Sequence, residues 1–521
     1  MNHTLDSLPA ELLYDIVSKF DTDAFHRSLL ALSRAIPRSP VPTHLLFPRI
    51  HLKRGEQVFQ LYRRLRNAPE DAALVQEFTF EDWTVDADIF VNLVALMPSL
   101  TYLKIFIGPN FAPEHLEEIF QKPRPQLQYL SMRFRPYVQR ATYYQFLKGA
   151  YFDSTLLALS SWPSPTLPVL SIIQDPLNPA IAPTNFAQPL VFFRLDPLST
   201  LAVSPMSSNL KHLRFRVPGR QIARHMHSAL HSFPALHFLD LSTCNIGGHD
   251  LAQLLGHMRH VQTVVMDGCP IVSQRTDIQL DAGDPFVQWA ELGEAIAVAG
   301  MVRATEREKK LKAWTEAFYV RENEEDDSKK GKKTKRGRKG LATATISLRA
   351  PSPERKAKPN QELPRARVPK RNERIRILPP LPALSSLATS FPGVLTPETY
   401  DAVRAEFERG WVAGITRLRL ARARHLTSWN NGVSRVVQFA DMGTPEWKEE
   451  ESYGEEGLVG LVDVKDVASF LLDVNEDEEA GGPARRGTDC PLLCIAGSKH
   501  DGPHVEGCGH RMGWETYKDE I

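Results

Sequence analysis

Apolar and polar residues alternate in six short segments between residues 74 and 266. Each segment has an apolar residue, two mostly polar residues and then apolar residues at every second position. The segments are LVQEFTF (74–80), SLTYLKI (99–105), QLQYLSM (126–132), NLKHLRF (209–215), ALHFLDL (235–241) and HVQTVVM (260–266). A period of two predicts β-strands with one buried face.

The spacing of these segments is nearly constant. Their first apolar positions are 75, 100, 127, 210, 236 and 261, so neighbouring segments lie 25 to 27 residues apart, except for one gap of 83 residues. That gap holds partial matches at 166–172 and 197–203, while 112–120, 221–233 and 249–258 have helical spacing. A strand and a helix every 25 to 28 residues is typical of leucine-rich repeats. The alternative is an ordinary α/β domain with leucine-rich strands.

The first twenty residues predict one amphipathic helix. In SLPAELLYDIVSKF (7–20) the apolar residues trace a single helical face, namely Leu8, Leu12, Leu13, Ile16, Val17 and Phe20. Pro9 falls in the first turn, where proline is tolerated. Further apolar clusters follow at 25–36 and 43–52. A block this short has little core of its own, so a partner protein best explains the apolar face.

This block resembles an F-box, as found in many fungal proteins, in its motif Leu8-Pro9-x-Glu11-Leu12-Leu13-x-x-Ile16 and its later Leu45-Leu46-Phe47-x-x-Ile50-x-Leu52. An F-box is commonly followed by leucine-rich repeats and docks the Skp-type adaptor of SCF-type cullin–RING ubiquitin ligases. The resemblance implies that the adaptor contacts Leu8, Pro9, Leu12, Leu13 and Ile16. The alternative is a helix that caps the repeat core.

Charge is strongly segregated, although the formal net charge is only +1. Residues 329–376 hold 18 Lys and Arg against 3 Asp and Glu, whereas 441–479 hold 14 acidic residues and 2 lysines. The basic segment has no aromatic residue, which favours a disordered linker and disfavours nucleic-acid binding. Its KKGKKTKRGRK run (329–339) has the pattern of a nuclear-localisation signal.

Cysteine and histidine residues, which commonly bind metal ions, are concentrated near the C-terminus. Cys490, Cys494, Cys508 and His510 form a C-x3-C-x13-C-x-H pattern, with His500 and His504 nearby. Tetrahedral zinc uses such ligands, but the spacing matches no common zinc finger, and reduced non-ligating cysteines are the alternative. The sequence alone therefore assigns no metal and no cofactor.

Several classes of protein are excluded or disfavoured. The longest apolar runs are too short for a membrane-spanning helix, the N-terminus lacks the features of a secretory signal, and five cysteines make no disulfide framework. The common phosphate-binding, nucleophile and metalloprotease motifs are missing, so we expect no enzyme.

The sequence thus predicts a mixed α/β protein in four parts. These are a small helical F-box-like module (1–52), a leucine-rich-repeat-like solenoid (53–300), a disordered basic and Pro-rich linker (303–390) and a small C-terminal region of unknown role (391–521). The expected function is a substrate-receptor subunit of an SCF-type ubiquitin ligase that binds the Skp-type adaptor and an unknown protein substrate, in the cytoplasm, the nucleus or both. The alternatives are a repeat scaffold outside any ligase, or a zinc-bearing protein associated with nucleic acid.

Overall fold

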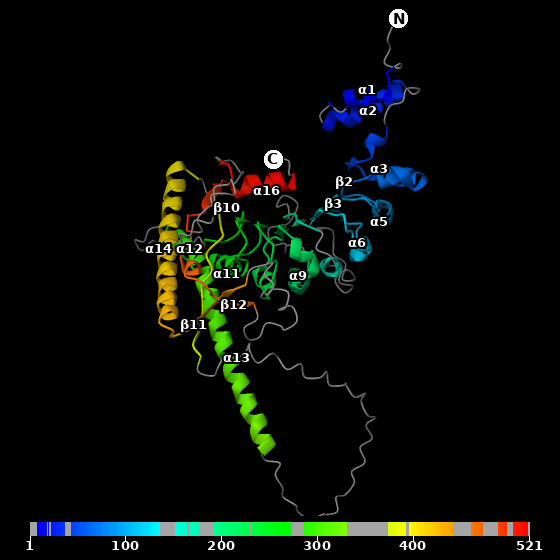
Figure 1. The fold of residues 1–521 in the computed structure, drawn as a ribbon. Coiled ribbons are helices and arrows are strands. Elements are labelled where there is room, and N and C mark those ends of the chain that lie inside the picture. Colours follow the sequence, from blue (N-terminus) through cyan, green and yellow to red (C-terminus); the bar gives the residue numbers. More distant parts are fainter. Residues whose placement is uncertain are drawn as a thin grey trace, which may run out of the picture. The chain divides into compact units, whose positions relative to one another are not determined.

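Figure 1 shows the fold in a computed structural model of the chain. The structure describes residues 8–17, 19, 22–36, 43–135, 152–163, 167–176, 191–229, 231–272, 286–330, 373–391, 395–440, 460–471, 488–497 and 504–518. The described chain divides into two compact units. One comprises residues 1–297, 382–414 and 487–521, and the other comprises residues 298–381 and 415–486.

The first unit begins with two helices that contact each other, α1 (Ala10–Val17) and α2 (Thr22–Ala35), followed by the short 3-10 helix η2 (Thr43–Leu46). Leu13 and Val17 of α1 and Leu29 of α2 are buried. The predicted N-terminal helix is therefore present, and part of its apolar face is covered.

Within the described residues, ten strands of the first unit form one all-parallel sheet. They are β1 (Arg49–Leu52), β2 (Glu77–Phe80), β3 (Tyr102–Ile107), β4 (Tyr129–Phe134), β5 (Val169–Gln174), β6 (His212–Arg216), β7 (Phe238–Asp240), β8 (Thr263–Val265), β10 (Ser386–Ser390) and β13 (Leu492–Ala496). The strands lie in chain order, so each new strand is added beside the preceding one of the sheet. All six strands predicted from the alternating segments belong to this sheet.

Helices lie between consecutive strands, as parallel pairing requires. They are α3 (Gly55–Asn67), α4 (Pro69–Ala73), α5 (Ala87–Ala95), α6 (Pro113–Gln121), α8 (Asp153–Ser160), α9 (Asp196–Ala202), η3 (Pro205–Asn209), α10 (Ala223–Met226), α11 (Gly248–His257) and α12 (Val287–Ala297). Each longer helix contacts the next one along the chain, so the helices form a continuous layer against the sheet. The partial strand match at 197–203 is wrong, because those residues lie in or directly after α9.

The predicted leucine-rich-repeat-like solenoid behind an F-box-like helical module is wrong as a description of the fold. The chain instead builds a ten-stranded parallel sheet with interleaved helices. The predicted α/β class agrees with this fold, and so does the alternative of an α/β domain with leucine-rich strands. The regular spacing did not distinguish leucine-rich repeats from an ordinary α/β fold, because any run of β-α-β units gives one strand and one helix at regular intervals. Moreover, β10 and β13 extend the sheet from outside residues 53–300.

The segment expected to be a disordered linker also contributes to the fold. Residues 303–330 belong to α13 (Ala299–Lys330), and residues 373–390 contain β9 (Ile375–Ile377) and β10. The rest of the basic segment, 331–372, lies outside the described residues, as do 441–459 and 472–479 of the acidic segment.

The C-terminal helix α16 (Gly509–Tyr517) packs on one face of the ten-stranded sheet, against β8 and β10. A Cβ at Gly509 would lie 3.0 Å from Cβ of Ala388, and one at Gly513 would lie 3.3 Å from Phe238. These two glycines, one helical turn apart, therefore allow the helix to approach the strands closely. At its far end the hydroxyl of Tyr129 donates to the carbonyl of Tyr517 at 3.1 Å.

The second unit contains α13, the C-terminal half of α14 (Pro397–Asn430) and a three-stranded sheet. In that sheet β11 (Arg435–Phe439) pairs in parallel with β9 and antiparallel with β12 (Leu461–Asp463), which is followed by the 3-10 helix η5 (Ala468–Phe470). Its core includes Leu311, Ile377 and Phe439. Among the described helices of both units, none combines the length and the apolar character that crossing a bilayer would demand.

Candidate metal centre and docking surface

The five residues implied in adaptor binding lie in α1 or directly before it, and they differ in exposure. Pro9 is exposed and directly precedes the helix, and its carbonyl accepts a bond from the amide of Leu13 at 3.2 Å. Leu8 is half-buried. Leu12 and Ile16 are 48% and 45% exposed, whereas Leu13 is only 1% exposed.

Exposure thus divides the apolar residues of α1 into two stripes. Leu12 and Ile16 are one turn apart and share an exposed face. We call the surface formed by Pro9, Leu12 and Ile16 the N-terminal apolar surface. Leu13 and Val17 form the neighbouring buried stripe. The structure therefore leaves Leu12 and Ile16 accessible to another protein and gives Leu13 a role in the interior of the module.

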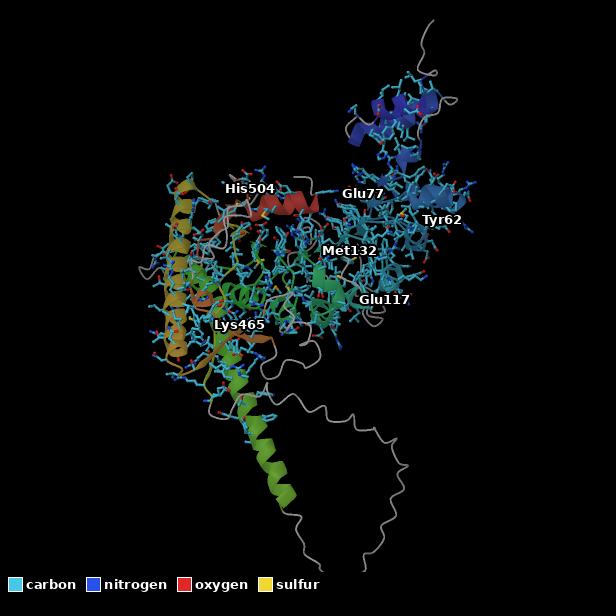
Figure 2. The ribbon with its side chains drawn as sticks, viewed as in Figure 1. Tyr62, Glu77, Glu117, Met132, Lys465 and His504 are labelled. Atoms are coloured by element: carbon cyan, nitrogen blue, oxygen red, sulfur yellow. The ribbon has the colours of Figure 1, made fainter. Side chains whose placement is uncertain are left out.

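The C-terminal cysteines and histidines form a second candidate site. Cys494 lies in β13, Cys508 directly precedes α16, and His510 lies in the first turn of α16. His504 joins them from the segment that leads to the helix, where Figure 2 labels it close to α16. Their four ligand atoms all lie within 4.8 Å of one another.

The predicted ligand set is corrected at one position by this geometry. Cys490 is not a member of the cluster, and His504 takes its place. Cys490 lies before β13 begins, and its thiol is not among the ligand atoms that come together. His500 lies outside the described residues.

The contacts within the cluster are short. The Sγ atom of Cys494 lies 3.3 Å from Nδ1 of His510 and 3.6 Å from Nδ1 of His504. Nδ1 of His504 also lies 3.9 Å from Sγ of Cys508. Both imidazole rings thus turn the same nitrogen toward the thiols.

Asp267, in the turn after β8, completes the surroundings of His510. Its Oδ1 atom lies 2.9 Å from Nε2 of His510, and both residues are buried. A carboxylate that holds the outer nitrogen of a histidine is a common arrangement around metal ligands, because it fixes the ring and its tautomer. Sequence reasoning missed Asp267, since nothing along the chain links it to the C-terminus.

Burial governs the chemistry of the thiols. Cys494, Cys508 and His510 are each no more than 3% exposed, and they adjoin an apolar cluster with Val265, Ala388 and Tyr517. Burial, with a further contribution from the neighbouring Cys508, raises the pKa of the Cys494 thiol well above its usual range. Without a cation this group is a protonated thiol, which makes it a poor nucleophile.

A separate surface pocket of about 510 Å³ lies next to the carboxyl ends of β6 and β7. Arg194, Arg220, Arg224 and His225 contribute to its lining. The guanidinium of Arg220 donates to the carbonyls of Phe192 and Phe193 at 2.7 and 3.1 Å, so it is held in place. This concentration of guanidinium groups suits an anionic ligand.

A scan against protein-family models gives no match for this chain, and a search of curated proteins gives no significant match. The function is therefore argued from these surfaces.

Proposed function

We propose that the protein is a substrate-receptor subunit of an SCF-type cullin–RING ubiquitin ligase. In this proposal the N-terminal apolar surface docks the Skp-type adaptor, and the α/β unit carries the substrate-binding surface. The observation that carries the proposal is the exposure of Leu12 and Ile16 within an F-box-like motif.

Energetics favour a partner for this surface. Fully burying an exposed leucine or isoleucine side chain stabilises by about 1.5–3 kcal/mol. Leu12 and Ile16 are each about half exposed, so covering both would contribute about 1.5–3 kcal/mol in total. Leu13 and Val17, which are buried, would keep α1 in position on α2.

The proposed role needs no catalytic group in this chain. A substrate receptor acts by position, because it raises the effective concentration of a target lysine near the ubiquitin thioester held elsewhere in the complex. We therefore propose a protein that is not itself an enzyme and acts in the cytoplasm, the nucleus or both.

The arginine-lined pocket is the surface that we propose for substrate recognition. Arg194, Arg220 and Arg224 would favour a substrate segment with phosphate or carboxylate groups. The pocket includes residues 193–196 from the middle of the long interval between β5 and β6, where a substrate receptor would vary its specificity.

The test is binding of the full-length protein to a purified Skp-type adaptor, measured by co-purification and by titration calorimetry. The double variant Leu12→Asp, Ile16→Asp places two charges on the proposed interface, and we expect at least about 30-fold weaker binding, the factor that corresponds to the loss of one hot spot of about 2 kcal/mol. Circular dichroism and thermal melting should match those of the wild type, because both side chains are exposed.

Leu157→Asp is the matched control. Leu157 is an exposed leucine of α8, 46% accessible, and lies outside the proposed interface. It should leave adaptor binding unchanged. If the wild-type protein does not bind the adaptor, or if the double variant binds as tightly as the control, the ligase function is wrong and a scaffold outside any ligase is the better description.

A further inference from the structure

A Cys2His2 cluster joins β13, the segment before α16 and the first turn of α16, which follow one another in the C-terminal part of the first unit. Cys494 comes from β13, His504 and Cys508 from the segment before α16, and His510 from α16 itself. From this arrangement we infer that Cys494, His504, Cys508 and His510 bind one structural zinc ion. The inference concerns a different surface from the adaptor interface and does not depend on it.

The geometry of the four ligand atoms fits zinc. A tetrahedron with Zn–S bonds of about 2.3 Å and Zn–N bonds of about 2.0–2.1 Å has edges of about 3.3–3.8 Å between its ligand atoms. Of the distances between sulfur and Nδ1 atoms, 3.3 and 3.6 Å fall within that range and 3.9 Å lies just above it. All four ligand atoms lie within 4.8 Å of one another, so small side-chain movements would close the set around one ion that contacts all four.

The chemistry of the ligands selects the type of cation. Two sulfurs and two imidazole nitrogens are soft and intermediate ligands, which zinc prefers and which calcium and magnesium avoid. The carboxylate of Asp267 is not one of the four ligands, because it contacts Nε2 of His510, the nitrogen that faces away from the thiols. That contact would leave Nδ1 of His510 free of its proton and available to the ion.

The site has the character of a structural centre. All four positions of the tetrahedron are taken by protein ligands, whereas a catalytic zinc keeps one position open for water or substrate. Three of the four residues are at most 3% exposed, and His504 is half-buried. A closed, buried site favours a role in holding the chain together.

The expected role is to fasten α16 to the sheet. The ion would join the end strand β13 to the start of α16, and Asp267 would connect the same point to the turn after β8. From there α16 reaches Phe238 and Tyr129, so an anchored N-terminal end would hold the whole helix across the strands.

The test begins with metal analysis of the full-length protein, purified under reducing conditions without chelator. We expect one zinc ion per chain by mass spectrometry of the elements. Cys494→Ser and Cys508→Ser should each lose most of the zinc, and Cys490→Ser, the matched control, should retain it, because Cys490 lies outside the cluster.

A second measurement covers the case in which the cysteine variants do not fold. Zinc is removed from the folded wild-type protein with a chelator, and cobalt(II) is added as a spectroscopic substitute. We expect the intense visible absorption of tetrahedral cobalt and a thiolate-to-cobalt charge-transfer band. Both signals should saturate at one equivalent of cobalt per chain.

Three results would overturn the inference. The first is a wild-type protein that neither contains zinc nor gives the tetrahedral cobalt spectrum. The second is zinc content that the Cys490→Ser change removes as fully as the Cys494→Ser change. The third, a disulfide between Cys494 and Cys508 in the reduced preparation, detected by thiol counting, would equally contradict a zinc site.

Discussion

The carboxylate of Asp267 lies 2.9 Å from Nε2 of His510, although 243 residues separate the two along the chain. Because an ionised carboxylate only accepts hydrogen bonds, the proton of the bond belongs to Nε2. Nδ1 then presents its lone pair toward Cys494, 3.3 Å away. The turn after β8 thus sets the tautomer of a residue in the C-terminal helix.

Replacing Asp267 by Asn should weaken zinc binding without removing a ligand. Loss of a partner of this kind commonly lowers metal affinity by about 10–100-fold, because the ring loses its fixed orientation and part of its basicity. Competition with a chromophoric chelator measures the affinity. Glu515→Gln changes an exposed carboxylate of α16 and is the matched control. Equal zinc affinity in the Asp267→Asn protein and the wild type would show that Asp267 does not support the site.

Removing zinc should loosen α16 specifically. If the ion anchors the helix, chelation should speed amide hydrogen exchange in residues 509–517 by at least about tenfold, which corresponds to a loss of about 1.4 kcal/mol in local stability. Peptides from α3 and α5 should change little, since these helices lie between β1 and β3, at the other end of the strand order. Exchange measured by mass spectrometry with and without chelator tests this, and re-addition of zinc should restore protection. Unchanged exchange in α16 would mean that apolar packing alone holds the helix.

The strands show how far apolar patterning can predict this fold. Alternation located β2, β3, β4, β6, β7 and β8, because the apolar residues at every second position of these strands are buried. The other face of β7 and β8 is buried as well, which the alternation did not predict. The pattern could not reveal that β10 and β13 join the same sheet. That pairing depends on contacts such as Ala388 with Val265 and with Cys494, which are remote along the chain.

The candidate site was only partly predictable for a related reason. Residue type pointed to Cys494, Cys508 and His510, but spacing alone could not choose between Cys490 and His504. The choice depends on how the segment before α16 folds back, because that fold places His504 beside Cys494 and Cys508 while Cys490 stays outside the cluster. Asp267 could not be predicted, since it comes from the turn after β8, which is remote along the chain. At the N-terminus, helical periodicity placed Leu12 and Leu13 together, and only the packing of α2 distinguishes the exposed residue from the buried one.

Arg214 and Asp240 form a buried ion pair beneath α16, and breaking it should be costly. Nε of Arg214 lies 3.0 Å from Oδ2 of Asp240, both side chains are 1% exposed, and the guanidinium lies 3.7 Å from the ring centre of Tyr517. Although burial alone would raise it, the charges of Arg216 and Arg214 hold the pKa of Asp240 below its usual range. Arg214→Met would leave Asp240 with only one of these partners.

We expect the Arg214→Met change to reduce the free energy of unfolding by about 3 kcal/mol, the lower end of the range for breaking a buried pair. Urea unfolding followed by tryptophan fluorescence measures the loss. Arg511→Met, on the exposed side of α16, is the control and should cost less than about 1 kcal/mol. A loss as small as that of the control would show that Arg216 alone compensates Asp240.

The contacts of Glu81 predict how the free energy of unfolding depends on pH. Its carboxylate lies 2.9 Å from Nε2 of His51 and 2.8 Å from Nζ of Lys104. The hydrogen bond with His51, together with Lys104 and against the opposing effect of burial, lowers the pKa of Glu81 to about 2. In the unfolded chain a glutamate has a pKa of about 4.3. A group whose pKa is lowered by folding stabilises the folded state above its unfolded pKa, and that contribution is lost as the pH falls toward the folded value.

The wild-type protein should therefore lose stability between about pH 5 and pH 2 partly through Glu81. Glu81→Gln cannot titrate, so its urea midpoint should be lower than that of the wild type at pH 7, and the difference should shrink as the pH falls to 3. Glu118→Gln alters an exposed carboxylate of α6 and should follow the wild-type curve with a constant offset. A difference between Glu81→Gln and the wild type that stays constant from pH 7 to pH 3 would mean that the ion pairs of Glu81 do not contribute to the acid sensitivity of the fold.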